Sequence, residues 1–314
     1  MVTDQHTVPR GAETLAIIGV GVIGLAWARL AREHAWDVRV FDVRPDVADV
    51  VNSVFGDDTG VMVADSLEDC IRGATFVQEN GPERLDIKRD TIGSLVAAAD
   101  PSVVIATSSS SITAGTIIAD GIVGSSVLVG HPFNPPDLMP LVEVVPSAAT
   151  SESAVTRAVS VYRSLGRTPV VINKEIAGFV ANRLQGVISR EARYLVQQDV
   201  VSPEDLDTIL QNSLGLRWAT IGLFEGNVLG GGPGGIRHLI SGVGVTTGGI
   251  EYHAPATDPA SMEKLVEQVE ATYGVGEDAY ETLRARRDSR TRAVLAALAA
   301  CDDQTASTPE GQQR

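Results

Sequence analysis

Residues 14–24 read TLAIIGVGVIG, a short apolar run that leads directly into a glycine turn. A helical pattern follows from Leu25 to His34, and a second apolar run, Val38–Asp42, ends in an acid. Strand, glycine turn, helix and strand in this order form the βαβ unit that binds dinucleotides. The stretch therefore predicts an α/β fold with a parallel sheet and a nucleotide site at its first turn.

The three glycines of the turn stand where the backbone geometry requires them. Gly19 permits the tight turn, Gly21 lets the backbone approach a pyrophosphate, and Gly24 allows helix and strand to pack closely. Val22 and Ile23 begin the helix, whose free N–H groups can bind phosphate oxygens. Similar turns occur in FAD and nucleotide-sugar sites and in folds that bind nothing, so the turn alone leaves those alternatives open.

An acid after the second strand bears on the choice of nicotinamide cofactor. Asp42 stands 18 residues after Gly24 and is placed to accept hydrogen bonds from ribose hydroxyls. A carboxylate there repels a 2′-phosphate, which favours NAD over NADP. Arg44 is close enough to leave NADP open as the less favoured cofactor. Glu79 follows another strand, and we expect it near a ribose of the cofactor.

Further apolar runs continue at the spacing of an α/β domain, and helical patterns lie between several of them, as at Asp86–Ala99 and Ser151–Ser164. The predicted fold class is a Rossmann-type doubly wound parallel sheet followed by an all-helical C-terminal domain. Polar candidates recur where these strands end, which is the edge at which such sheets bind ligands. The runs are Ala74–Val77, Val103–Ala106, Val127–Val129, Leu141–Val145 and Pro169–Ile172.

With 314 residues the chain is long enough for two domains. Helical patterns at 176–195, 261–273 and 278–300 place the second domain after the last strand. We expect a flexible N-terminus (1–12), an NAD-binding Rossmann domain (13–174), a helical substrate and dimerisation domain (175–300) and a disordered tail (301–314).

Composition excludes several classes of function. A net charge of −15 disfavours binding to nucleic acid or to an anionic membrane surface. No apolar stretch approaches the roughly 18 residues of a transmembrane helix, and the first residues lack a signal-peptide pattern. Cys70 and Cys301 match no metal or redox spacing. We therefore expect a cytoplasmic protein with reduced thiols and no metal site.

A histidine and a glutamate are predicted to face each other across a proline-rich turn. His131 ends an apolar run and precedes PFNPP, and Glu143 interrupts the run Leu141–Val145. A carboxylate inside a buried strand is costly without a partner. An imidazole held by a carboxylate is suited to moving a proton on and off a substrate oxygen near neutral pH. The alternative for His131 is a core histidine.

Four further motifs stand in one register: ATSSSSI at 106–112, HPFNPP at 131–136, LVEVV at 141–145 and GFVANRL at 178–184. With the glycine turn they resemble the 3-hydroxyacyl-CoA dehydrogenase family from Leu15 to about Gly222. The resemblance implies an NAD-binding domain, a helical domain that dimerises, and an active site in the cleft between them. A homodimer through the C-terminal domain is therefore expected.

The resemblance also implies roles for single residues. His131 would be the general acid/base, with Glu143 as its orienting partner. Ser110 and Asn182 would hydrogen-bond the reacting oxygen of the substrate, although a capping serine and a surface helix residue are the ordinary alternatives. Asn134 would support the His131 turn or contact the nicotinamide.

Two departures from the family concern the substrate. Only residues 43–74 connect the second strand with the next predicted strand, where acyl-CoA enzymes carry a long helical pair that helps to hold the CoA ester. GLRWA at 215–219 and GGGPGG at 230–235 look closer to the free-acid branch of the family. That branch contains L-gulonate 3-dehydrogenase with lambda-crystallin, L-carnitine dehydrogenase and actinomycete polyketide ketoreductases.

Arg217 is the candidate clamp for a substrate carboxylate, because guanidinium binds carboxylate with two hydrogen bonds; a structural ion pair is the alternative. We expect loops at 223–227 and 230–235, the latter with close backbone approach. The predicted function is NAD-dependent interconversion of a free 3-hydroxy acid, such as a polyketide intermediate or sugar acid, and its 3-keto form. The alternatives are a short-chain 3-hydroxyacyl-CoA dehydrogenase and a non-catalytic, crystallin-like NAD-binding protein.

Overall fold

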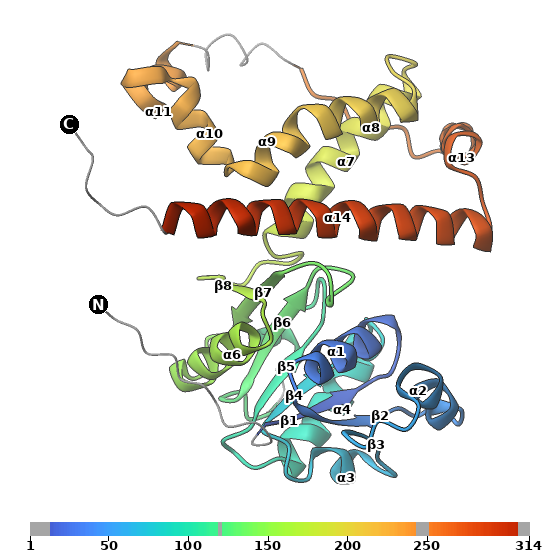
Figure 1. Ribbon diagram of the computed structural model, residues 1–314, viewed down its shortest axis with the longest axis vertical. Coiled ribbons are helices and arrows are strands. Elements are labelled where there is room, and N and C mark those ends of the chain that lie inside the picture. Colours follow the sequence, from blue (N-terminus) through green and yellow to red (C-terminus); the bar gives the residue numbers. More distant parts are fainter. Residues whose placement is uncertain (1–12, 119–120, 243–250, 307–314) are drawn as a thin grey trace. The chain divides into compact units, whose positions relative to one another are not determined.

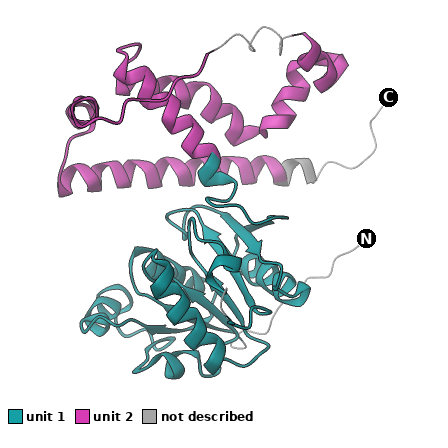
Figure 2. Ribbon diagram, turned by 180° about the vertical axis from the view of Figure 1, so that it is seen from behind, with its two compact units in different colours: residues 1–183 teal, residues 184–314 magenta. Residues whose placement is uncertain are grey.

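The computed structural model describes residues 13–118, 121–242 and 251–306. The expected flexible N-terminus lies outside the described residues. The chain divides into two compact units, residues 1–183 and 184–314 (Figure 2). This boundary falls after Arg183 and not after residue 174, because Phe179 is buried against Val129 and Val145 of the sheet and keeps the intervening segment with unit 1.

An eight-stranded sheet forms the centre of unit 1, in the order β3-β2-β1-β4-β5-β6-β7-β8 (Figure 1). Neighbours among β1 to β6 pair in parallel, β7 pairs antiparallel with β6, and β8 pairs parallel with β7. The doubly wound sheet predicted from the sequence is confirmed. Its strands are β1 (Thr14–Ile18), β2 (Asp37–Phe41), β3 (Val61–Val63), β4 (Phe76–Glu79), β5 (Val104–Thr107), β6 (Val127–Pro132), β7 (Leu141–Pro146) and β8 (Thr168–Val171).

Helices cover both faces of this sheet, because successive strand residues point to opposite faces. Leu15 and Ile17 of β1 join a core with residues of α1 and α6, whereas Ala16 and Ile18 join a second core with residues of α3 and α4. Side-chain oxygens of serine or threonine cap α3, α5 and α6. The helices are α1 (Val22–Glu33), α2 (Val47–Phe55), α3 (Leu67–Ile71), α4 (Leu85–Ala98), α5 (Ala114–Ile117) and α6 (Glu152–Ser164).

The connection from β2 to β4 is short, as the sequence predicted. It holds two short helices, α2 and α3, with the edge strand β3 between them. The sequence prediction missed this strand, because three residues at a sheet edge give too short an apolar pattern to recognise. A long helical pair does not occur at this point of the described chain.

Helices also make up the described part of unit 2. The expected loop at 223–227 is wrong, because these residues form most of α10. The close backbone approach expected for GGGPGG is confirmed: a Cβ on Gly231 would lie 1.9 Å from the carbonyl oxygen of Gly235. The helices are α7 (Ala181–Gln197), α8 (Pro203–Asn212), α9 (Leu214–Thr220), α10 (Leu223–Gly230), the 3₁₀ turn η1 (Gly232–Gly234), α11 (Gly235–Ser241), α13 (Pro259–Tyr273) and α14 (Glu277–Ala306).

The last helix extends further than the sequence indicated. Helix α14 continues to Ala306, so residues 301–306 are helical where a disordered tail was expected. Residues 307–314 lie outside the described part of the chain. Among the described helices, none combines the length and the apolar character needed to cross a membrane.

Candidate active site

The turn between β1 and α1 has the geometry of a phosphate cradle. Gly19 adopts a φ of +92°, and a Cβ there would lie 2.8 Å from the carbonyl carbon of Asn80. A Cβ on Gly24 would lie 2.0 Å from the carbonyl oxygen of Gly19, so only glycine lets α1 start this close to the turn. Gly21 faces open space. The tight turn at Gly19 and the close packing at Gly24 are as expected, and the contact of Gly21 with a pyrophosphate stays a prediction.

The start of α1 is open to an anion. No side chain caps this helix, and its first turn, which begins with Val22 and Ile23, contains no acid. The first N–H groups of a helix have no partner within the helix and carry partial positive charge. A pyrophosphate beside Gly21 would receive hydrogen bonds from this helix end, which is the arrangement that dinucleotides require.

Asp42 is fixed in place by two backbone groups. Its Oδ2 accepts a hydrogen bond from the Val20 N–H at 2.7 Å, and its Oδ1 accepts one from the Arg44 N–H at 3.0 Å. The Arg44 guanidinium is bound by Asp46 through two hydrogen bonds of 2.7 and 2.9 Å. The cation that could have favoured a 2′-phosphate is therefore engaged by a neighbouring carboxylate.

A pocket of about 540 Å³ adjoins the turn and Asp42. Its walls come from the glycine turn, the end of β2, the loop after β4 and one side of α4. Both the size and the position suit the adenosine half of a dinucleotide. The lining residues are Ile18, Gly19, Gly21, Phe41, Asp42, Val43, Leu67, Asn80, Gly81, Pro82, Ile87, Asp90, Thr91 and Ser94.

Glu79 differs from the expectation. Its side chain is 1% exposed, and its carboxylate accepts hydrogen bonds from Lys88 Nζ at 2.9 Å and Thr107 Oγ1 at 2.6 Å. It also accepts one from the Gly81 N–H. A carboxylate buried and bonded in this way holds the loop after β4 in place and has no free oxygen for a ribose. The prediction that Glu79 contacts the cofactor is therefore wrong.

Glu83 was missed by the sequence reasoning, although it organises the serine loop. Its Oε1 accepts hydrogen bonds from the backbone N–H groups of Ser110 and Ser111 at 3.0 and 2.9 Å, and from Ser109 Oγ at 2.8 Å. Burial raises the pKa of Glu83, but the hydrogen bonds from Ser109 and Ser111 and the charge of Lys88 outweigh it and leave the pKa lowered. The ionised carboxylate holds residues 109–111 in one conformation.

His131 and Glu143 are direct cross-strand partners in the antiparallel pair of β6 and β7. His131 Nδ1 lies 2.9 Å from Glu143 Oε2, and both side chains are buried, at 7% and 2% exposed. The rings of Phe179 and Phe133 lie next to the imidazole, with centroids 5.3 and 6.0 Å from its own. The structure thus brings together the pair that the sequence placed on either side of a turn.

The second oxygen of Glu143 binds the start of α7. Glu143 Oε1 accepts hydrogen bonds from the Val180 and Ala181 N–H groups at 2.9 and 3.1 Å. Gly178 and Phe179 just before them have φ values of +74° and +47°, and this turn directs the two N–H groups to the carboxylate. Burial raises the pKa of Glu143, but the hydrogen bonds from His131, Val180 and Ala181 outweigh it and lower the pKa.

Ser110 and Asn182 meet at the same edge of the sheet. Asn182 Nδ2 donates a hydrogen bond to the backbone carbonyl of Ser110 at 3.1 Å. The Ser110 hydroxyl lies 3.4 Å from Glu83 Oε1. Asn134 lies in the turn between β6 and β7 and is exposed. Arg167 holds this turn by donating hydrogen bonds to the carbonyls of Pro136 and Met139, at 3.0 and 3.4 Å.

Comparisons with known proteins fit this geometry. The 3-hydroxyacyl-CoA dehydrogenase NAD binding domain matches residues 57–176, and the C-terminal domain of the same family matches residues 178–282. L-carnitine dehydrogenase of Pseudomonas putida is 34% identical over 304 residues, which cover 91% of this chain and 94% of that protein. The chain belongs to the 3-hydroxyacyl-CoA dehydrogenase family.

Other members of the family support the same conclusion. A 3-hydroxyacyl-CoA dehydrogenase of Gibberella moniliformis is 42% identical over 236 residues, 70% of this chain and 73% of that protein. Among solved structures, an NAD⁺-dependent dismutase, 5-formyl-3-hydroxy-2-methylpyridine 4-carboxylic acid 5-dehydrogenase, has a TM-score of 0.76. It is 26% identical, and the match covers 91% of this chain and 98% of that one.

Family membership confirms the predicted class of enzyme and its cofactor. The protein is an NAD-dependent oxidoreductase that acts on a CH–OH group; the glycine turn and Asp42 indicated the cofactor, and the family resemblance indicated the reaction. The non-catalytic, crystallin-like alternative is not supported. Arg217 lies on α9 in unit 2 and is exposed, so its assignment as a carboxylate clamp stays a prediction.

Proposed function

We propose that this family member interconverts a free 3-hydroxy carboxylic acid and its 3-keto form, with His131 as the general acid/base. The observation that carries the proposal is the buried hydrogen bond between His131 Nδ1 and Glu143 Oε2. The lowered pKa of Glu143 keeps this carboxylate ionised near neutral pH. An ionised carboxylate can only accept, so Nδ1 carries the hydrogen and Nε2 holds the lone pair.

His131 can therefore remove the hydroxyl proton of a substrate through Nε2, and Glu143 stabilises the imidazolium that forms. NAD, when bound, supplies the acceptor for the hydride that leaves the carbinol carbon. In the reverse direction His131 returns the proton to the oxygen. Ser110 and Asn182 are proposed to donate hydrogen bonds to this oxygen. Asn182 is suited to this role because its amide has two N–H groups, of which one is bonded to the Ser110 carbonyl.

Two observations support a free acid as substrate. The β2–β4 connection contains only two short helices and an edge strand, where a long helical pair would hold a CoA ester. Several relatives, from Pseudomonas putida to Streptomyces coelicolor, are named L-carnitine dehydrogenases, and carnitine is a 3-hydroxy carboxylic acid. Arg217 is a cation with the geometry to bind a carboxylate, and we propose it as the clamp.

We further propose that two copies of the chain associate through unit 2. Helices α8, α9, α10 and α11 bury no residue within a single chain. Phe224 and Leu229 of α10 are 76% and 64% exposed. Apolar exposure on this scale is typical of a homodimer interface and destabilises a soluble monomer.

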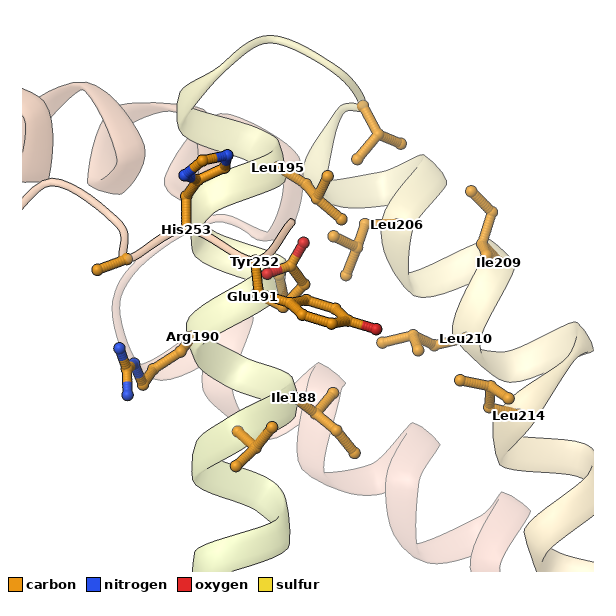
Figure 3. A pocket seen from close by; sticks show the side chains of 14 residues that line it. Ile188, Arg190, Glu191, Leu195, Leu206, Ile209, Leu210, Leu214, Tyr252 and His253 are labelled. Carbon is orange, nitrogen blue, oxygen red and sulfur yellow. The ribbon is translucent and has the colours of Figure 1, made fainter. Parts of the chain in front are cut away.

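Unit 2 also has a pocket of about 580 Å³, which is lined by α7, α8 and residues 252–254 (Figure 3). In the close-up, Ile188 and Leu195 of α7 and Leu206 and Leu210 of α8 line its two sides. A second copy is the occupant that fits both the pocket and the exposed helices. Light scattering should give the mass of a dimer for the wild type and of a monomer for Phe224→Glu/Leu229→Glu. A monomeric wild type would exclude this arrangement.

The substrate proposal is tested by following NADH oxidation with a panel of free 3-keto acids and with acetoacetyl-CoA, for wild type and His131→Ala. We expect at least one free acid to be reduced with a kcat/KM above that of acetoacetyl-CoA. The kcat/KM of His131→Ala for this acid should be lower than that of wild type by a factor of about 10² to 10⁴. Faster turnover of acetoacetyl-CoA than of every free acid would exclude the free-acid substrate and the Arg217 clamp.

A further inference from the structure

Gln78 occupies the centre of a buried polar network that the proposed reaction does not use directly. It lies on β4, is 1% exposed and uses its whole amide. The amide oxygen accepts a hydrogen bond from the Tyr162 hydroxyl at 2.8 Å. The amide nitrogen donates to Ser108 Oγ at 2.8 Å and to the Gly130 carbonyl at 3.2 Å. A buried amide that is satisfied on both sides has a fixed position and orientation.

The bond to Gly130 replaces a missing rung of the sheet next to His131. The Ile105 N–H donates to the Ser126 carbonyl between β5 and β6. In parallel strands this rung recurs every second residue, so the Gly130 carbonyl would receive the Ser109 N–H. Strand β5 ends at Thr107, however, and the Ser109 N–H bonds to the Thr107 hydroxyl instead. The amide of Gln78 takes the position of the lost donor.

Tyr162 sets the direction of the amide. It is fully buried, and burial raises the pKa of its hydroxyl, so the group stays protonated and donates. This donation fixes which end of the Gln78 amide is the oxygen, and the nitrogen must then face Gly130 and Ser108. A side chain at Gly130 is impossible here, because a Cβ would lie 1.8 Å from the Tyr162 hydroxyl oxygen.

The network also extends, through Ser108 and Asn80, to the pocket beside the glycine turn. Ser108 Oγ donates to Asn80 Oδ1 at 2.7 Å, and Asn80 Nδ2 donates to the backbone carbonyl of Gln78 at 2.9 Å. Asn80 lines the pocket beside the glycine turn. One amide on β4 thus holds the strand that carries His131, the start of the serine loop and a wall of the adenosine pocket.

We propose that Gln78, oriented by Tyr162, is a positioning residue of the reaction: it sets where the end of β6 holds His131 and where the serine loop begins. This inference rests on the proposed role of His131. Gln78 acts on the site through the Gly130 carbonyl and Ser108, without touching the substrate. Loss of its hydrogen bonds shifts His131 Nε2 relative to the reacting oxygen and lowers kcat, while the affinity for cofactor changes less.

Helix α6 provides a matched control. Tyr162 connects this helix to the sheet near the strand ends that carry the site, and Arg157 connects it to Glu13 at the opposite edge through a hydrogen bond of 2.9 Å. Tyr162→Phe removes one hydroxyl and retains the ring, which packs on Trp27 and Phe76. Arg157→Met removes a polar link between the same helix and the sheet, away from the site.

The experiment compares kcat, KM for NADH and Tm for wild type, Gln78→Met, Tyr162→Phe and Arg157→Met, with the best 3-keto acid. Since a displacement on the order of 1 Å can cost about a hundredfold in rate, we expect kcat to fall about a hundredfold in Gln78→Met and about tenfold in Tyr162→Phe. KM for NADH should change by less than about threefold in both. Arg157→Met should keep kcat within about twofold of wild type, even if its Tm falls as much as the Tm of Tyr162→Phe.

If Gln78→Met does not fold, Tyr162→Phe still tests whether the Gln78 network positions His131. A kcat for Tyr162→Phe equal to that of Arg157→Met would overturn the proposal, because the network would then contribute only stability. His131→Ala separates this outcome from failure of the proposed function. If His131→Ala is as active as wild type, the proposed reaction itself is refuted. An inactive His131→Ala beside a fully active Tyr162→Phe refutes only the positioning role.

Discussion

Glu143→Gln tests the proton-transfer assignment most sharply, because it changes one atom of the carboxylate and conserves its shape. Glu143 accepts three hydrogen bonds, from His131 Nδ1–H and from the Val180 and Ala181 N–H groups. The carbonyl oxygen of a glutamine can still accept both backbone bonds. Its NH₂ group must then face His131 Nδ1 as a donor, so Nδ1 becomes the acceptor and Nε2 carries the hydrogen.

The wrong tautomer removes the base that the reaction needs. With the hydrogen on Nε2, His131 cannot accept the hydroxyl proton, and the imidazolium of the reverse reaction loses its carboxylate. General acid/base catalysis contributes about 10² to 10⁴ in rate, which corresponds to about 3 to 5 kcal/mol of transition-state stabilisation. We therefore expect kcat of Glu143→Gln to fall by a factor on the order of 10² to 10⁴, both for oxidation of the hydroxy acid and for reduction of the keto acid. KM for NADH should stay close to that of wild type.

The same substitution has a predicted effect on acid stability. The pKa of Glu143 lies below its ordinary value of 4.5 in the folded protein. Its charge therefore contributes stability that is fully present above pH 4.5 and is lost as the pH falls through the lowered folded value. Glu143→Gln removes this contribution, so the difference in unfolding free energy between wild type and variant should shrink as the pH falls below 4.5.

Initial rates with NAD and with NADH, together with urea unfolding at several pH values, measure these effects. Glu13→Gln is the matched control, because Glu13 is another bonded carboxylate, 11% exposed, that lies at the opposite edge of the sheet. Its kcat should stay within about threefold of wild type, since it has no role in proton transfer. A Glu143→Gln enzyme that also keeps wild-type kcat would refute the tautomer argument.

Three further outcomes are expected. Gly24→Ala should weaken NADH binding by more than about tenfold in a fluorescence titration, because its Cβ would lie 2.0 Å from a carbonyl oxygen of the turn; Gly93→Ala, with its nearest contact at 3.7 Å, should not. Asp42→Ala/Asp46→Ala should raise the kcat/KM ratio of NADPH to NADH by about tenfold, because it removes one repelling carboxylate and frees the arginine that Asp46 binds; an unchanged ratio contradicts this. Arg217→Gln should raise KM for the keto acid about tenfold and leave KM for NADH unchanged. If wild type and variant have the same KM for the keto acid, Arg217 is not the clamp.

Local sequence patterns were enough to predict the first half of the fold. The run 14–24 fixes a strand, a turn and a helix because glycine is required at positions where a Cβ collides with backbone. The His131–Glu143 contact was also within reach, because a hairpin pairs residues that are close in sequence and the register sets them opposite each other.

Contacts between distant segments were not predictable in this way. Gln78 and Tyr162 are 84 positions apart and meet only because α6 packs on the sheet. Lys88 carried a signal that could have been recognised: it shares the buried face of α4 with Ile92 and Leu95, where a lysine requires a carboxylate partner. That partner is Glu79, which explains why Glu79 was misassigned to the cofactor.

Part of unit 2 was harder to predict, because helix α10 lacks a clear apolar face. Residues 223–227 were expected to form a loop, but they belong to this helix, whose glycine and apolar residues do not gather on one face. Such a helix gains little from burial within one chain and depends on a second surface. The sequence pattern could therefore indicate a helical region in general but not the individual helices α8 to α11.

The central claim is that His131, held by Glu143, moves the proton in an NAD-dependent reduction of a 3-keto acid. The most direct measurement is a single-turnover mixing experiment, in which enzyme with bound NADH meets the keto acid and NADH absorbance is followed for wild type and His131→Ala. We expect a rapid absorbance decay for wild type and a decay that is about 10²- to 10⁴-fold slower for the variant. Equal decay rates in the two proteins would contradict it.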